Sequence, residues 1–129
     1  MSGLEVEIVG GPAGDVQALK RLCAQALARV GVADGHLAIE FVDEKRIREL
    51  NRRHRGVDRP TDVLSFGIDE AGPAAGPREL GDIVICPSHT EDIGEAVVHG
   101  ALHLAGMDHE ADSGEMLALQ SELFRSRRP

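Results

Sequence analysis

The residues best suited to chemistry lie in one short segment, HGALHLAGMDH at residues 99–109. His99 and His103 are four residues apart, a spacing that places both rings on one face of a helix. Gly106 suits a helix end and a left-handed turn, which would bring His109 back toward the other two histidines. Three converging imidazoles leave one tetrahedral position open, which is typical of a catalytic site holding one Zn²⁺ ion.

The same spacing occurs in the metzincin peptidases, H-E-x-x-H-x-x-G-x-x-H. Those enzymes place a general-base glutamate next to the first ligand, whereas this chain has Gly100 there. Peptide hydrolysis needs a carboxylate that moves a proton from water to the leaving amine. Asp108 and Glu110 flank His109 and could orient that ligand, but neither occupies the base position. A zinc metallopeptidase with its base on another segment is therefore an alternative hypothesis.

A second candidate segment is strongly basic. Residues 45–59 hold seven of the fourteen Lys and Arg residues against two acidic residues, so the segment carries +5. Since the whole chain carries −8, the remainder carries −13. Such a run is common on a solvated helix face, but guanidinium groups also bind phosphate oxygens through paired hydrogen bonds. Beside a metal site, this segment suits phosphodiester chemistry.

Composition restricts the class of protein and of partner. The 129 residues suit one domain, residues 1–129. Three Phe with no Tyr or Trp argue against recognition by base stacking, and the negative net charge argues against a generally basic nucleic-acid binder. Neither a signal peptide nor an apolar run of about 20 residues occurs, which favours a cytoplasmic protein without a membrane partner.

The predicted strands and helices that must position these segments alternate in the first part of the chain, and two helices follow at its end. Strands are predicted over residues 4–9, 36–42, 63–68 and 80–86. Helices are predicted over residues 15–30, 44–53, 88–105 and 112–125, the last two opened by the capping pairs Ser88–Glu91 and Asp112–Glu115. The Gly- and Pro-rich residues 70–79 predict a mobile surface loop. The order indicates an α+β domain with a mixed sheet of about four strands and about four to five helices.

Three blocks of the sequence carry a family resemblance. They are HGALHLAGMDH, LNRRHRGVDRPTDVLSF at residues 50–66 and LGDIVIC at residues 80–86, within a similarity that covers most of residues 37–124. The first resembles H-G-x-L-H-L-x-G-Y-D-H, the signature of the YbeY endoribonuclease family of bacterial rRNA maturation factors. The resemblance implies a zincin-like fold, zinc bound through the signature histidines, and action on the 3′ end of small-subunit rRNA.

The resemblance also implies roles for residues and partners. The family's functional arginine maps onto Arg55, which is expected to hold the scissile phosphate as a catalytic residue. Its basic neighbours Arg52, Arg53 and Arg59 are expected to bind substrate. The implied partners are rRNA and the ribosomal small subunit, with ribosomal proteins or a ribosome-associated GTPase as candidate protein partners.

Three departures from the family pattern bear on substrate fit. Met107 replaces the usual Tyr, and His54 replaces the aromatic residue that commonly precedes the arginine. The stretch between Cys86 and His99 has only twelve residues, which is short for the family. The histidines outside the signature, His36, His54 and His89, have no partner at ligand spacing and are expected to be incidental.

The leading hypothesis is a metal-dependent endoribonuclease selective for single-stranded RNA in ribosome maturation. Weak sequence preference and strong salt dependence of RNA binding are expected, because recognition would depend mainly on phosphate contacts. Besides the peptidase, the remaining alternative is a non-catalytic assembly module. In that module zinc would stabilise the fold and the basic segment would dock on the ribosome.

Overall fold

The computed structural model describes residues 3–10, 15–67 and 79–126. The elements in chain order are β1 (Gly3–Val9), α1 (Val16–Arg29), β2 (Asp34–Phe41), α2 (Glu44–Arg55), β3 (Val63–Gly67), β4 (Glu79–Ile85), the 3₁₀ turn η1 (Pro87–His89), α3 (Ile93–Leu104) and α4 (Glu115–Ser126). The predicted loop at residues 70–79 lies outside the described residues, except for Glu79. Across the described ranges, no helix has the length and hydropathy needed to cross a bilayer.

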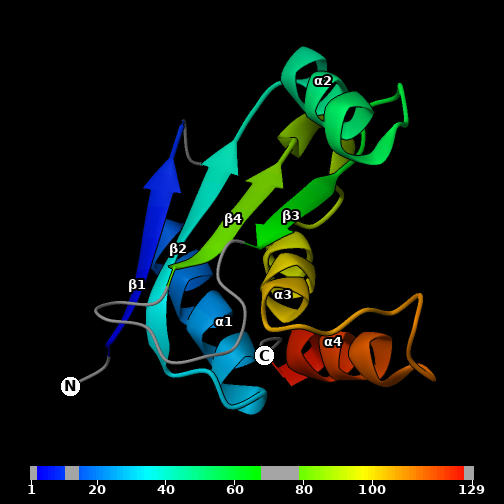
Figure 1. The fold of residues 1–129 in the computed structure, drawn as a ribbon. Helices are drawn as coiled ribbons and strands as arrows, with labels where there is room; N and C mark the ends of the chain where they lie inside the picture. Colours follow the sequence, from blue (N-terminus) through cyan, green and yellow to red (C-terminus); the bar gives the residue numbers. More distant parts are fainter. Residues whose placement is uncertain (1–2, 11–14, 68–78, 127–129) are drawn as a thin grey trace.

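The four described strands form one mixed sheet in the order β1-β2-β4-β3 (Figure 1). β1 pairs with β2 and β2 with β4 in parallel, whereas β3 runs antiparallel to β4 at the edge. The mixed sheet and the accompanying helices confirm the predicted α+β class. Because β3 is an edge strand, one of its sides is open to neighbouring loops and ligands.

The two faces of the sheet bury different sets of side chains. Ile83 and Ile85 of β4 belong to the main core, which α1 and α3 share with the sheet and which α4 completes by packing on α3. Val84 points the other way and clusters with Leu64 of β3 and with Ile47 of α2. This alternation along β4 is the period of a strand that is covered on both faces. It places α2 on the face of the sheet opposite to α3.

The start of α3 differs from the prediction. Ser88 does not cap the helix, because Pro87–His89 forms a separate 3₁₀ turn in which the Ser88 hydroxyl lies 3.3 Å from the Cys86 sulfur. The helix begins at Ile93, and the side chain of Asp92 accepts a hydrogen bond of 3.0 Å from the Glu95 N–H. Both pairs fit the capping signature, and the apolar helical periodicity begins only after Asp92.

The start of α4 is also later than predicted. The helix begins at Glu115, and the Asp112 carboxylate accepts hydrogen bonds from the N–H groups of Gly114 and Met116 instead of capping a helix that starts beside it. The remaining predicted boundaries agree to within two residues. The extension of α2 to Arg55 matters most, because it adds His54 and Arg55 to the last turn of that helix.

Gly100 lies where α3 packs tightly against the sheet. A Cβ atom at this position would lie 2.5 Å from Cγ2 of Ile83 and 3.1 Å from the Ser65 hydroxyl oxygen. The Ser65 hydroxyl donates a hydrogen bond of 3.3 Å to the Gly100 carbonyl oxygen. The position that holds the glutamate base in the metzincin pattern therefore faces β3 and β4 here and has no room for a side chain.

Replacing Gly100 by alanine should destabilise the protein despite alanine's higher helix propensity. Overpacking costs about 1–3 kcal/mol and the propensity gain returns up to about 1 kcal/mol, so we expect a net loss of roughly 1–2 kcal/mol. Urea unfolding of the metal-free protein measures this loss. An unchanged urea midpoint would show that α3 can move away from Ile83 without lowering the free energy of unfolding.

Candidate metal centre

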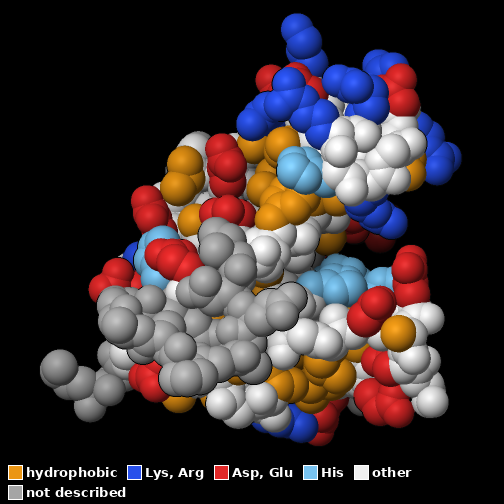
Figure 2. Space-filling model, in the orientation of Figure 1, with side chains coloured by type: hydrophobic (Ala, Val, Ile, Leu, Met, Phe, Trp, Pro, Cys, Tyr) orange, Lys and Arg blue, Asp and Glu red, His pale blue; other side chains and the backbone are white. Residues whose placement is uncertain are grey.

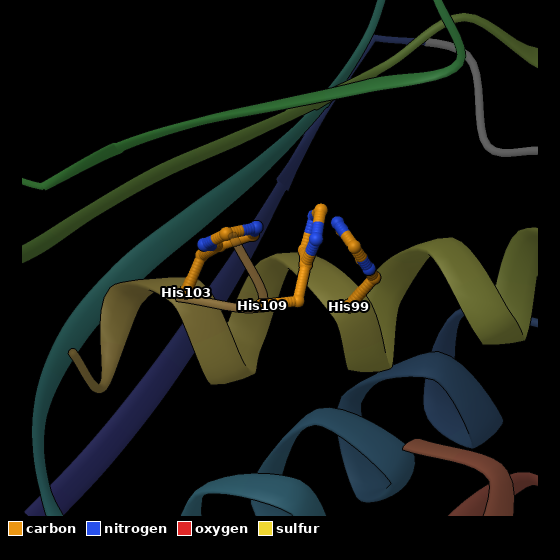
Figure 3. A group of neighbouring side chains, drawn as sticks. All are labelled: His99, His103 and His109. Carbon is orange, nitrogen blue, oxygen red and sulfur yellow. The ribbon is translucent and has the colours of Figure 1, made fainter. Parts of the chain in front are cut away.

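Three histidines from two segments converge beside β3 (Figure 3). His99 and His103 project from the same face of α3, and His109 reaches them from the loop that follows. Their ring centroids are 4.7, 5.3 and 5.4 Å apart, and one nitrogen of each ring lies within 4.8 Å of the others. The structure thus brings the three sequence-predicted ligands together in a group that could hold a metal ion.

The backbone turn after α3 produces this convergence. Gly106 has a φ of 102°, in the left-handed region, and its N–H donates to the His103 carbonyl oxygen at 3.0 Å. The next N–H, of Met107, donates to the Leu102 carbonyl oxygen at 3.0 Å. These two bonds end the helix and reverse the chain, so that His109 returns to the helix face.

The surroundings of His103 favour its neutral form. Burial lowers the pKa of His103, and repulsion from His99 and His109 lowers it further, against a hydrogen bond with the Met107 backbone. A neutral imidazole is the form that donates a lone pair to a metal ion. The donor set therefore fits a divalent metal ion.

A glutamine outside the signature orients the first ligand. Oε1 of Gln120, in α4, lies 2.7 Å from Nδ1 of His99. Because the amide oxygen accepts a hydrogen bond, Nδ1 carries the proton and Nε2 keeps its lone pair for a metal. The sequence analysis missed Gln120, because the two residues are 21 positions apart and meet only when α4 packs on α3.

We expect Gln120→Leu to weaken metal binding about 10- to 100-fold, the usual effect of losing a partner that orients a ligand. Gln120→Glu keeps an acceptor at the same place and should bind metal at least as tightly as the unmodified chain. Competition with a fluorescent chelator measures both dissociation constants. Equal affinities for the Leu and Glu variants would contradict the orienting role.

The histidine cluster lies in a cleft of about 850 Å³. Its other walls are β3, the end of α2 with His54 and Arg55, and the acidic residues Asp108 and Glu110. The Asp108 carboxylate accepts from the Glu110 N–H at 3.0 Å. Figure 2 shows basic side chains over α2, acidic side chains over the segment that leads into α4, and histidine side chains in the hollow between them.

Only one of the four candidate arginines lines this cleft. The Arg55 side chain is exposed and makes no hydrogen bond or ion pair with any described residue, so its guanidinium is available to a ligand. Arg52, Arg53 and Arg59 are exposed but lie outside the lining of the cleft. Arg53 pairs with Glu49 at 3.3 Å.

The histidines outside the signature have different surroundings. His89 pairs with Glu44 at 3.2 Å and does not belong to the group of three histidines that could hold a metal ion. His36 lies between two carboxylates, 3.0 Å from Glu79 and 3.2 Å from Glu7. His54, by contrast, lines the cleft and contacts Phe66.

His36 should make stability depend on pH. The hydrogen bond to Glu79, together with that to Glu7, raises the pKa of His36 above 6.5 against the effect of partial burial. Its stabilising contribution is therefore complete below the unfolded-state pKa and disappears as pH rises through the higher folded-state pKa. Between about pH 6 and about pH 8.5, urea unfolding should show a larger loss of stability for the unmodified chain than for His36→Gln. Equal losses would contradict this.

Comparison with known proteins agrees with the geometry. The family described as endoribonuclease YbeY matches residues 14–127. The endoribonuclease YbeY of Bacillus cytotoxicus is 38% identical over 84% of each chain, and that of Rubrobacter xylanophilus is 39% identical over 95% of this chain and 92% of its own. The solution structure of TM1509 from Thermotoga maritima is similar with a TM-score of 0.58 and 29% identity, covering 95% of this chain and 93% of that one. The chain belongs to the endoribonuclease YbeY family of metal-dependent hydrolases.

Proposed function

We propose that this chain, acting as one domain over residues 1–129, is a zinc-dependent endoribonuclease that cleaves single-stranded rRNA in the maturation of the small subunit. The observation that carries the proposal is the juxtaposition of two groups in one cleft. His99, His103 and His109 form a nitrogen donor set, and Arg55 presents a guanidinium with no partner among the described residues. Metal ligands beside an unpaired arginine suit a phosphodiester substrate.

Each group has a defined task in this mechanism. The three imidazoles hold Zn²⁺ through their lone pairs, with Gln120 fixing the tautomer of His99. When bound, Zn²⁺ supplies Lewis-acid chemistry at the phosphoryl oxygens. Arg55 binds the scissile phosphate through two N–H groups and stabilises the charge that develops on it in the transition state.

The missing glutamate is less important for RNA than for peptides. Gly100 occupies the base position of the metzincin pattern, but RNA carries a 2′-hydroxyl that can act as an internal nucleophile. The products distinguish the two possible nucleophiles. Ends with a 2′,3′-cyclic phosphate indicate the 2′-hydroxyl, whereas a 5′-phosphate with a 3′-hydroxyl indicates water.

The exposed arginines contribute at longer range. Arg52, Arg53 and Arg59 are exposed outside the cleft, where they attract the RNA backbone and dock the enzyme on the small subunit in the cytoplasm. Ribosomal proteins or a ribosome-associated GTPase are the candidate protein partners. Binding to free RNA should weaken steeply with salt, because phosphate contacts release counterions.

Cleavage of a single-stranded fragment from the 3′ end of small-subunit rRNA tests the proposal. Purified protein should cleave this fragment but not its duplex form, and chelation should stop the reaction until Zn²⁺ is restored. Activity that persists after chelation would point to a contaminating ribonuclease. Binding to small subunits without any metal-dependent cleavage would favour the assembly module instead.

A further inference from the structure

Two rings line the metal cleft beside Arg55. His54, in the last turn of α2, and Phe66, in β3, have ring centroids 4.6 Å apart and planes inclined at 51°. The His54 side chain is exposed and that of Phe66 is half-buried. Both belong to the wall of the cleft that also contains the clustered histidines. The cleft therefore has a small aromatic surface in addition to its metal ligands and its guanidinium.

The position of Phe66 is set by packing on both sides of its strand. The Phe66 side chain packs against the buried cluster that includes Ile47 and Leu64. Across the strand pair, Gly81 has a φ of 134°, and a Cβ atom there would clash with the Phe66 carbonyl oxygen. Glycine thus permits the close approach of β4 to β3. A ring held in this way loses little conformational entropy when a ligand stacks on it.

We propose that His54 and Phe66 form a stacking site for an unpaired nucleobase of the RNA, next to the phosphate that Arg55 holds. This inference rests on the proposed ribonuclease function. His54 and Arg55 both line this cleft, so a base contact and a phosphate contact by them fall on neighbouring parts of one nucleotide strand. An exposed ring face inside a polar cleft suits a base, because every base has a flat π-face.

Stacking at this site supplies a physical reason for selectivity toward single strands. A base within a duplex is covered on both faces by its neighbours, whereas an unpaired base can leave its stack and lie on a ring of the protein. The contact tolerates any base and so adds little sequence preference. The low aromatic content of the chain argued against recognition by base stacking, but this site requires only two rings, those of His54 and Phe66.

A cycle that pairs protein variants with abasic RNA tests the stacking site. The rate constant kcat/KM is measured on a single-stranded RNA and on versions that each lack one base near the scissile bond. For the unmodified protein, we expect removal of one particular base to lower kcat/KM by about 5- to 50-fold. Phe66→Leu, which keeps the apolar packing, should cause a similar loss on intact RNA but almost none on that abasic RNA.

Two variants of His54 complete the test. His54→Ala changes an exposed position, so it should fold normally and show the same non-additive pattern. His54→Tyr keeps an aromatic ring and should recover most of the kcat/KM on intact RNA that His54→Ala loses. The combination of variant and abasic RNA could instead lower kcat/KM by the product of the two separate factors. That result would overturn the stacking site while leaving the ribonuclease function intact. Absence of any metal-dependent cleavage by the unmodified protein would instead overturn the proposed function.

Discussion

His103→Ala should abolish RNA cleavage by removing one of the three proposed metal ligands. His103 lies within ring contact of both His99 and His109, so its loss leaves two donors that no longer close a site. The Lewis acid contributes several kcal/mol to transition-state stabilisation, so the rate should fall roughly 10³-fold or more. The bound metal, measured by atomic absorption after dialysis, should fall in parallel with the cleavage rate.

His89→Ala is the matched control for this variant. His89 lies in the 3₁₀ turn before α3, pairs with Glu44 and is not one of the three clustered histidines. Its replacement should leave metal content and cleavage rate unchanged. Full cleavage by the His103→Ala protein, with metal content also retained, would show that the cluster is not the metal site of the reaction.

Arg55→Ala should reduce kcat/KM by about 10²–10³-fold while metal content stays unchanged. The Arg55 guanidinium lines the cleft with no acidic partner among the described residues, so its removal takes away charge stabilisation without freeing another buried group. The slope of log kcat/KM against log salt should become shallower by about 0.7, as expected for one lost phosphate contact on single-stranded RNA. Steady-state kinetics at several salt concentrations measure both quantities.

Two variants distinguish the effect of the paired hydrogen bonds of the Arg55 guanidinium from the effect of its charge alone. Arg55→Lys keeps the charge but loses the paired N–H groups, so its rate should fall between those of arginine and alanine. Arg52→Ala removes the same charge from the same helix at an exposed position outside the cleft. It should change the rate only a few-fold, in the range of exposed electrostatic contacts, about 0–1 kcal/mol. Equal losses of kcat/KM for Arg52→Ala and Arg55→Ala would show that Arg55 contributes only long-range electrostatic attraction.

Local sequence signals predicted the metal centre because its parts are close in the chain. His99 and His103 share a helix turn, and Gly106 readily adopts the left-handed conformation that the observed chain reversal requires. The same local reasoning misplaced the start of α3. Ser88 and Asp92 each satisfy the capping pattern, and the choice between them depends on where the apolar face of α3 meets the sheet.

Residues that meet through tertiary packing were beyond such reasoning. Gln120 reaches His99 only because α4 packs on α3, and nothing in their 21-residue separation signals a contact. The ring of Phe66 reaches His54 because β3 lies beside the last turn of α2. Counting aromatic residues could not reveal this pair, because composition contains no information on placement.

The sequence by itself determined the donor set, the separation of a +5 segment from an acidic remainder, and the α+β order of the elements. These features depend on residue type and on spacing within a few helical turns, where backbone geometry is regular. Only the tertiary structure showed that Arg55 lines the cleft while its basic neighbours lie outside it, and that position 100 has no room for a side chain. Those outcomes depend on how α2 and α3 pack against the two faces of the sheet, which no local pattern encodes.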